Sequence, residues 1–193
     1  MDYILLALSW AFFYSLHSIL AASKLKRILE EKLGKAYKWY RLFYSFLSTV
    51  LFLGIVIQSL FIPNQFLLTK TPFLTYLGYM MAALGTIIAM KAMKQVSFSS
   101  FIGIKPDNFL KTEGRLVTTG WYARMRHPLY SGLILIFLGY FLVAGTITAG
   151  IHLLCLLLYL PFGIYYEERN LIALFGEEYR EYQKKVPSIF PKF

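Results

Sequence analysis

Long uncharged stretches alternate with short basic ones along this chain. The stretches without Asp, Glu, Lys or Arg are 3–22, 42–62, 71–90 and 128–166. The first three contain 20 or 21 residues each, and a helix of about 20 apolar residues crosses the hydrocarbon core of a bilayer. The pattern therefore predicts membrane-spanning helices.

The fourth stretch is too long for a single span, because its 39 residues are almost twice what one crossing needs. Gly145 and Gly150 enclose a Thr-Ile-Thr-Ala segment that favours a turn. We therefore expect the chain to reverse there, between two spans. The expected fold is an all-α integral membrane bundle, a single domain covering 1–193, with five spans near 3–22, 42–62, 71–90, 128–145 and 149–167.

Three other patterns add detail to this bundle. Leucine and isoleucine at helical spacing in 24–38 predict a short amphipathic helix at the membrane surface. Aromatic and apolar residues at the same spacing in 171–182 predict a cytoplasmic C-terminal helix. The third span has small residues every three or four positions, which favours close helix packing; they are Gly78, Ala82, Gly85 and Ala89.

Composition and charge agree with a membrane protein. Only 16% of the residues are charged, against about a quarter in soluble domains. The net charge of +10 would also suit nucleic acid, but 19 of the 20 basic residues lie in 23–41, in 91–127 and after Tyr166. The positive-inside rule makes these segments cytoplasmic and the N-terminus external. We therefore attribute the excess charge to topology and to membrane lipid, and expect no nucleic-acid partner.

Two features narrow the class further. Cys155 is the only cysteine and lies in an apolar run, which excludes a disulfide framework and a cysteine-based metal site. The chain opens with Met1-Asp2 and has no basic segment before its first span, so we do not interpret that span as a cleavable signal peptide.

Polar residues crowd at two places beside the last two spans. One is the segment 120–130 before the fourth span, and the other is 167–170 after the fifth. A reversal between these spans brings both segments to the cytoplasmic face. One histidine and two adjacent glutamates do not form a metal site, so we expect none. The residues brought together are Arg124, Arg126, His127, Tyr130, Glu167, Glu168 and Arg169. Both signs of charge beside an apolar bundle suit a zwitterionic cofactor and an apolar substrate.

The order of these motifs resembles a known family. Arg126-His127-Pro128-Leu129-Tyr130, an uncharged hairpin, Glu167-Glu168 and the Phe175–Tyr182 segment are similar to the C-terminal half of integral-membrane methyltransferases. That family includes isoprenylcysteine carboxyl methyltransferases, phospholipid methyltransferases and methanethiol S-methyltransferases of the NnrU branch. The resemblance covers about 118–191 and implies S-adenosylmethionine as the cofactor, bound in a C-terminal half of about 115–193. The acceptor implied is lipophilic or a small thiol or carboxylate.

The resemblance also assigns candidate roles. The candidate catalytic residues are Arg124 and Arg169, which would favour the anionic form of an acceptor. The candidate cofactor-binding residues are Val117, Gly120, Trp121, Tyr122, Arg126, His127, Pro128, Tyr130, Glu167 and Glu168. Arg124 or Arg126 would hold the cofactor's carboxylate, either glutamate its ammonium or ribose, and the rings of Trp121 and Tyr122 its adenine. Between the two glutamates, Glu167 is marginally favoured. Because the site lies at a water-filled mouth, loss of Arg126 or of either glutamate is expected to cost little stability.

Other interpretations remain open at this stage. The prenylcysteine enzymes usually carry arginine where this chain has Lys185, which weakens the case for that substrate. Sterol and steroid reductases that use NADPH have a similar C-terminal pattern, but a longer set of helices than five spans provide. A non-catalytic membrane scaffold is the third possibility, although a scaffold does not need the crowd of opposed charges. Arg124 and Arg126 would then be boundary charges only.

Overall fold

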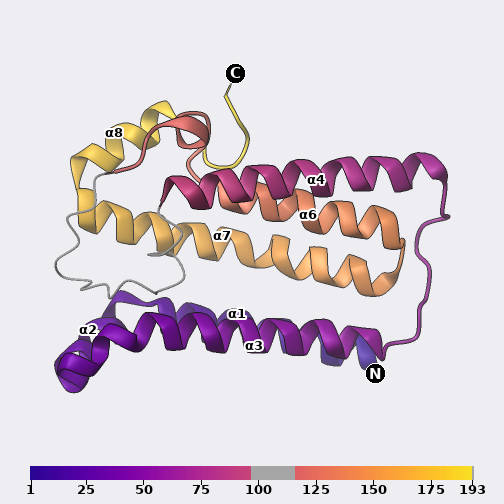
Figure 1. The fold of residues 1–193 in the computed structure, drawn as a ribbon, viewed down its shortest axis with the longest axis horizontal. Coiled ribbons are helices and arrows are strands. Elements are labelled where there is room, and N and C mark those ends of the chain that lie inside the picture. Colours follow the sequence, from indigo (N-terminus) through magenta and orange to yellow (C-terminus); the bar gives the residue numbers. More distant parts are fainter. Residues whose placement is uncertain (97–115, 193) are drawn as a thin grey trace. The chain divides into compact units, whose positions relative to one another are not determined.

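The computed structural model of the protein describes residues 1–96 and 116–192 (Figure 1). Every regular element in these residues is a helix, which confirms the predicted all-α class. Lys105, Lys111 and Arg115, which contribute to the predicted basic segment 91–127, lie outside the described residues.

The chain divides into two compact units. Among the described residues, the first unit contains 1–62 and 96, and the second contains 63–95 and 116–192. The first is built from α1 (Asp2–Ala21), α2 (Ser23–Leu33), η1 (Gly34–Trp39) and α3 (Tyr40–Leu60). The second is built from α4 (Pro72–Gln95), η3 (Gly120–Ala123), α6 (Pro128–Ala144), α7 (Ile147–Phe175) and α8 (Glu177–Lys185). The single-domain interpretation of the sequence stays a prediction.

Several helices are suited to a membrane by their length and composition. Among the described residues, α1, the Leu42–Leu60 part of α3, α4 and α7 are long and apolar enough to span one. Helix α6 is equally apolar but has 17 residues. Large apolar side chains such as Phe12, Phe46 and Met80 are exposed along these helices, as a surrounding hydrocarbon phase permits. These features indicate an integral membrane protein.

In the first unit, α1 packs against α3. Trp10 is buried and stacks on Tyr14. The hydroxyl of Tyr44 on α3 lies 2.7 Å from Nε2 of His17 on α1. A hydrogen bond between neighbouring helices satisfies this polar side chain within an apolar helix pair.

Small residues bring α4 and α6 together in the second unit. A Cβ atom added to Gly85 would lie 2.5 Å from the carbonyl oxygen of Gly132, and one added to Gly78 would lie 2.7 Å from that of Gly139. Cβ of Ala82 faces Gly139 in turn. The expected close-packing face of the third span is therefore confirmed, and α6 is its partner. Helix α6 also contacts α7 (Figure 1).

The connection between α6 and α7 is two residues long, Gly145 and Thr146. Gly145 has φ +65°, a conformation that L side chains rarely adopt. The Thr146 hydroxyl caps α7 by accepting from the amide of Ala149 at 3.2 Å. Backbone bonds tie this turn to the chain before α4, including Leu67 N–H to Gly145 O at 2.7 Å.

Helix α7 differs from the expectation at its C-terminal end. The fifth span was expected to end near 167 and a separate helix to cover 171–182. Instead α7 continues to Phe175, and α8 begins at Glu177 after Gly176, whose φ is +59°. No proline or glycine lies in 164–175, so nothing there interrupts the helix. A helix of 29 residues is about 43 Å long, which exceeds a hydrocarbon core of about 30 Å. Its last turns, with both glutamates, therefore extend beyond the apolar region.

Candidate active site

The extended segment at the C-terminus binds alongside the residues that precede α6. We call residues 186–192 the C-terminal strap. The amide of Arg126 donates to Pro187 O at 2.8 Å, and that of His127 donates to Ser188 O at 2.9 Å. The Ser131 hydroxyl donates to Ile189 O at 2.7 Å. These bonds hold the start of α6 in a fixed position relative to the end of the chain.

Arg126 and Glu168 form the centre of the polar cluster. Nε and Nη2 of Arg126 both lie 2.7 Å from Oε1 of Glu168. Nη1 of Arg126 donates to the carbonyl oxygens of Gln183, at 3.2 Å, and Val186. The side chains of Arg126 and Glu168 are 13% and 17% exposed. The guanidinium therefore links α7, α8 and the C-terminal strap, and its donors are directed at protein acceptors.

His127 lies between the two glutamates and is buried. Its Nε2 donates to Oε1 of Glu168 at 3.0 Å, and its Nδ1 lies 3.5 Å from Oε2 of Glu167. The ring stacks on Tyr130 at a centroid distance of 5.5 Å. Burial by itself lowers the pKa of His127, but the two carboxylates outweigh it and leave this pKa raised above its ordinary value. The protonated ring is thus stabilised at this site.

Glu167 is the more accessible of the two glutamates. Its side chain is 45% exposed, against 17% for Glu168. Burial and then the charge of Glu167 raise the pKa of Tyr122 to about 12, so this tyrosine stays neutral. The hydroxyl of Tyr182 donates to the carbonyl oxygen of Tyr122 at 2.5 Å. Glu167 therefore offers an available carboxylate close to a fixed aromatic residue.

A buried hydroxyl without a partner lies in the same region. Tyr179 on α8 is almost completely buried, and its Oη has no hydrogen-bond partner among the described residues. Burial and the nearby charge of Glu168 raise the pKa of this tyrosine, so its hydroxyl stays protonated. An unsatisfied donor beside a charged cluster is costly and is a candidate for a contact with a bound ligand.

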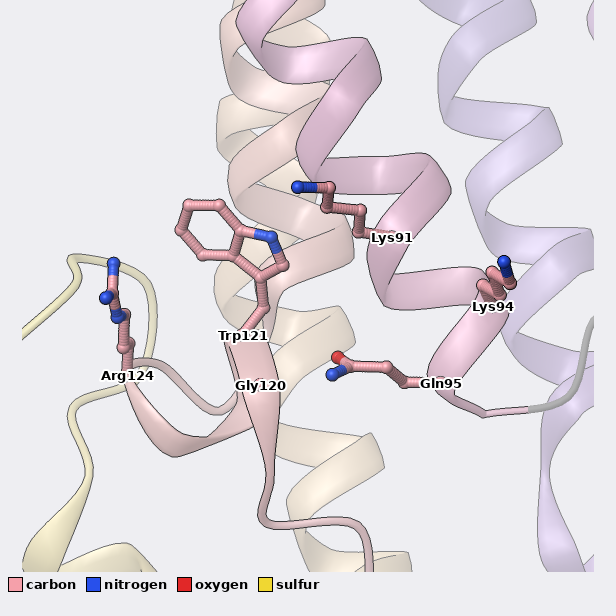
Figure 2. Close-up of a pocket in the computed structure, with 6 residues that line it drawn as sticks. All are labelled: Lys91, Lys94, Gln95, Gly120, Trp121 and Arg124. Carbon is pink, nitrogen blue, oxygen red and sulfur yellow. The ribbon is translucent and has the colours of Figure 1, made fainter.

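Gly120, Trp121 and Arg124 lie beside a cavity at the end of α4, with a volume of about 570 Å³. Figure 2 shows Trp121 between the side chains of Arg124 and Lys91. The Arg124 guanidinium lies 5.8 Å from the centre of the Trp121 ring. The α4 residues beside this cavity were not among the predicted site residues; they are Lys91, Lys94 and Gln95. Their i, i+3 lysine spacing at the end of the third span was the available signal.

Gly120 allows this cavity to form. It has φ +60°, and a Cβ atom there would lie 1.7 Å from Nε2 of Gln95. That nitrogen donates to the carbonyl oxygen of Thr119 at 3.3 Å. The positive φ favours glycine at this position, and the end of the Gln95 side chain occupies the space that a Cβ atom would take.

The other predicted site residues occupy varied positions. Pro128 is buried at the first position of α6, where proline costs no hydrogen bond. Val117 is half-buried before η3, and Arg169 is exposed on α7. The structure thus brings together Arg126, His127, Glu167 and Glu168, with Tyr122 and Tyr130 beside them. The C-terminal strap and Gln183 were not among the predicted site residues, because carbonyl contacts leave no mark on side-chain patterns.

Comparison with known proteins assigns the chain to a family. Residues 73–178, more than half of the chain, match the model of the phospholipid methyltransferase family. The chain belongs to this family of methyltransferases.

Individual relatives agree with that assignment. A protein-S-isoprenylcysteine O-methyltransferase of Schizosaccharomyces pombe is 36% identical over 119 residues, which are 60% of this chain and 48% of the relative. Methanethiol S-methyltransferase 1 of Bradyrhizobium diazoefficiens is 42% identical over 83 residues, 42% of this chain and 27% of the relative. A probable protein-S-isoprenylcysteine O-methyltransferase of Oryza sativa is 33% identical over 122 residues, 62% of each. The chain thus spans between about a quarter and three fifths of the length of these relatives.

Proposed function

We propose that this protein is an integral membrane methyltransferase that uses S-adenosylmethionine to methylate a lipophilic acceptor or a small thiol or carboxylate. The observation that carries the proposal is the cluster of His127, Glu167 and Glu168, all within the 73–178 segment matched by the family. The relatives named above are methyltransferases of an isoprenylcysteine and of methanethiol, which supports both acceptor types.

The chemistry of the cluster fits the proposed cofactor. S-Adenosylmethionine carries an ammonium, a carboxylate, a ribose and an adenine, and its sulfonium supplies the methyl group. Glu167 has the accessible carboxylate that an ammonium or a ribose hydroxyl needs. The Tyr179 hydroxyl has no partner among the described residues and offers a donor to a carboxylate. Trp121 and Tyr122 supply flat, half-buried rings for an adenine.

In this proposal Arg126 is mainly a positioning residue. Its guanidinium is directed at Glu168 and at two backbone carbonyls, and so holds α7 and the C-terminal strap where the cofactor would bind. His127 orients Glu167 and Glu168 from between them. Methyl transfer from a sulfonium depends on alignment more than on proton transfer. Arg126 and His127 therefore contribute by holding the proposed cofactor site in a fixed geometry.

Arg124 and Arg169 are the proposed catalytic residues. Both are exposed, whereas the guanidinium of Arg126 is bonded to Glu168 and to two backbone carbonyls. A guanidinium near the acceptor would favour a thiolate or carboxylate over its protonated form. The remaining proposed cofactor contacts are Val117, Gly120, Pro128 and Tyr130, which shape the same region.

The topology completes the proposal. We infer five spans, with α6 as the fifth beside the four longer helices, an external N-terminus and a cytoplasmic C-terminus. The support is the distribution of basic residues, with Lys70 alone on the external side. The cofactor site then faces the cytoplasm.

Ligand-induced stabilisation distinguishes the proposed activity from NADPH-dependent reduction. S-Adenosylmethionine or S-adenosylhomocysteine should raise the melting temperature of the detergent-solubilised protein, and NADPH should not. At a ligand concentration 100 times the Kd, the gain is about 2.7 kcal/mol. Stabilisation by NADPH alone would favour a reductase, and no response to either ligand would favour a non-catalytic scaffold.

A further inference from the structure

The cavity at the end of α4 contains two cations that the proposed methyl transfer does not use, Lys91 and Lys94. Among the described residues, its lining consists of Lys91, Lys94, Gln95, Gly120, Trp121 and Arg124. Three of these six residues are cations and none is acidic. At about 570 Å³, the cavity is large enough for a small molecule or a lipid headgroup.

The position of the two lysines favours an anion. Lys91 and Lys94 lie in the last two turns of α4, where the apolar part of the helix ends. Their two full positive charges outweigh the partial negative charge of the helix C-terminus. In Figure 2 the amine of Lys91 is directed to the side on which Trp121 lies. A lysine pair and a tryptophan at the end of a spanning helix are typical of the headgroup level of a membrane.

An apolar stripe continues from the cavity along α4. Ile87, Leu84 and Met80 precede Lys91 at intervals of four, three and four residues, so they share its face of the helix. All three side chains are exposed. A free phosphate ion would use only the cations, whereas a phospholipid would use the cations and the stripe together.

We propose that this cavity binds the phosphate group of an anionic phospholipid, with one acyl chain along the exposed stripe of α4. Lys91, Lys94 and Arg124 attract the phosphate, and Trp121 lies beside the glycerol. Basic pockets between helices at the cytoplasmic end of a membrane protein bind anionic lipid headgroups by this chemistry. The bound lipid is neither cofactor nor methyl acceptor. It shares Trp121 and Arg124 with the proposed methyl-transfer site, so its binding is tested without cofactor and by affinity alone.

Fluorescence quenching tests this site through Trp121. The full chain in detergent is titrated with phosphatidylglycerol that carries brominated acyl chains, without any cofactor. The response of Trp121 is the part of the quenching that disappears in Trp121→Phe. We expect this part to saturate with phosphatidylglycerol and to be much weaker with phosphatidylcholine of the same brominated chains.

Paired lysine variants make the test specific. Lys91→Ala/Lys94→Ala should weaken the affinity for phosphatidylglycerol roughly thirtyfold, about fivefold for each lysine, and Lys91→Arg/Lys94→Arg should retain it. Lys32→Ala/Lys35→Ala removes two exposed lysines at the same spacing from the first unit and should change the affinity less than twofold. Circular dichroism confirms that each variant is helical.

Three results would overturn the proposal. Equal quenching by phosphatidylcholine would show that the headgroup charge is not recognised. Full competition by millimolar inorganic phosphate would identify a simple anion site in place of a lipid site. An equal loss of affinity in both alanine pairs would show diffuse attraction to a basic surface.

Discussion

The same substitution at the two adjacent glutamates of α7 should change two different properties of the protein. Glu167→Gln removes an accessible carboxylate whose ion-pair contact among the described residues is Nδ1 of His127, at 3.5 Å. Glu168→Gln removes a carboxylate that accepts from Arg126, His127 and Gln183 at 2.7, 3.0 and 2.9 Å. We therefore expect Glu167 to determine cofactor affinity and Glu168 to determine stability.

The magnitudes follow from these contacts. A charge-assisted bond lost from the cofactor costs ~1.5–3 kcal/mol, so Glu167→Gln should weaken S-adenosylhomocysteine binding roughly ten- to a hundredfold. Glu168→Gln leaves the largely buried guanidinium of Arg126 without its counter-charge, although the amide can still accept one bond. We expect a loss of about 2 kcal/mol in the free energy of unfolding, or about 4–8 °C in melting temperature.

Isothermal titration with S-adenosylhomocysteine and thermal unfolding without ligand provide the two measurements. Glu181→Gln is a matched control, because its side chain is 49% exposed and bonds only Lys184 among the described residues, at 2.6 Å. It should change neither quantity measurably. The reasoning is refuted if Glu167→Gln lowers the melting temperature as much as Glu168→Gln does. It is also refuted if Glu167→Gln leaves the affinity unchanged.

Three other predictions concern packing, pH and topology. Gly85→Ala should destabilise the protein by about 1–3 kcal/mol in thermal unfolding, because its Cβ would lie 2.5 Å from Gly132 O. Gly54→Ala is the control: no described atom lies within 4 Å of its Cβ, so it should be neutral or stabilising. The raised pKa of His127 makes its stabilising contribution complete below about pH 6.5 and lost as pH rises through the folded pKa. The difference in melting temperature between the protein and His127→Gln should therefore shrink as the pH rises above about 6.5, and a constant difference would contradict the assignment. A cysteine at Lys35 should react with an impermeant thiol reagent only from the cytoplasmic side and one at Asn64 only from outside, and the reverse pattern would invert the proposed orientation.

The structure changes the stability cost that we expect for substitutions in the polar cluster. From the sequence, loss of Arg126 or Glu168 was expected to cost little, because water at the membrane surface would replace either partner. In the structure both side chains are less than one fifth exposed and bond to each other and to the end of the chain. Water cannot freely replace these contacts, so the expectation of a small cost holds only for Glu167.

The sequence by itself determined the helices and the region of the site. Long uncharged runs can be stable in hydrocarbon only as helices that satisfy their own backbone bonds. The bounds of α1, α3, α4 and α6 agree with the predicted spans within two residues, except at the end of α4. The RHPLY and EE motifs likewise located the cluster of charges, since each lies at the end of an apolar run.

Only the tertiary structure decided which of the two glutamates is bonded to Arg126 and which is accessible. Glu167 and Glu168 are identical in type and adjacent in sequence, but successive residues of a helix point about 100° apart. One therefore faces Arg126 and Gln183 of α8, and the other is left accessible. The cavity of Lys91, Gln95 and Gly120 likewise depends on a contact between residues 24 or more positions apart. Side-chain patterns record which face of a helix is apolar, whereas the partner of that face is chosen by packing.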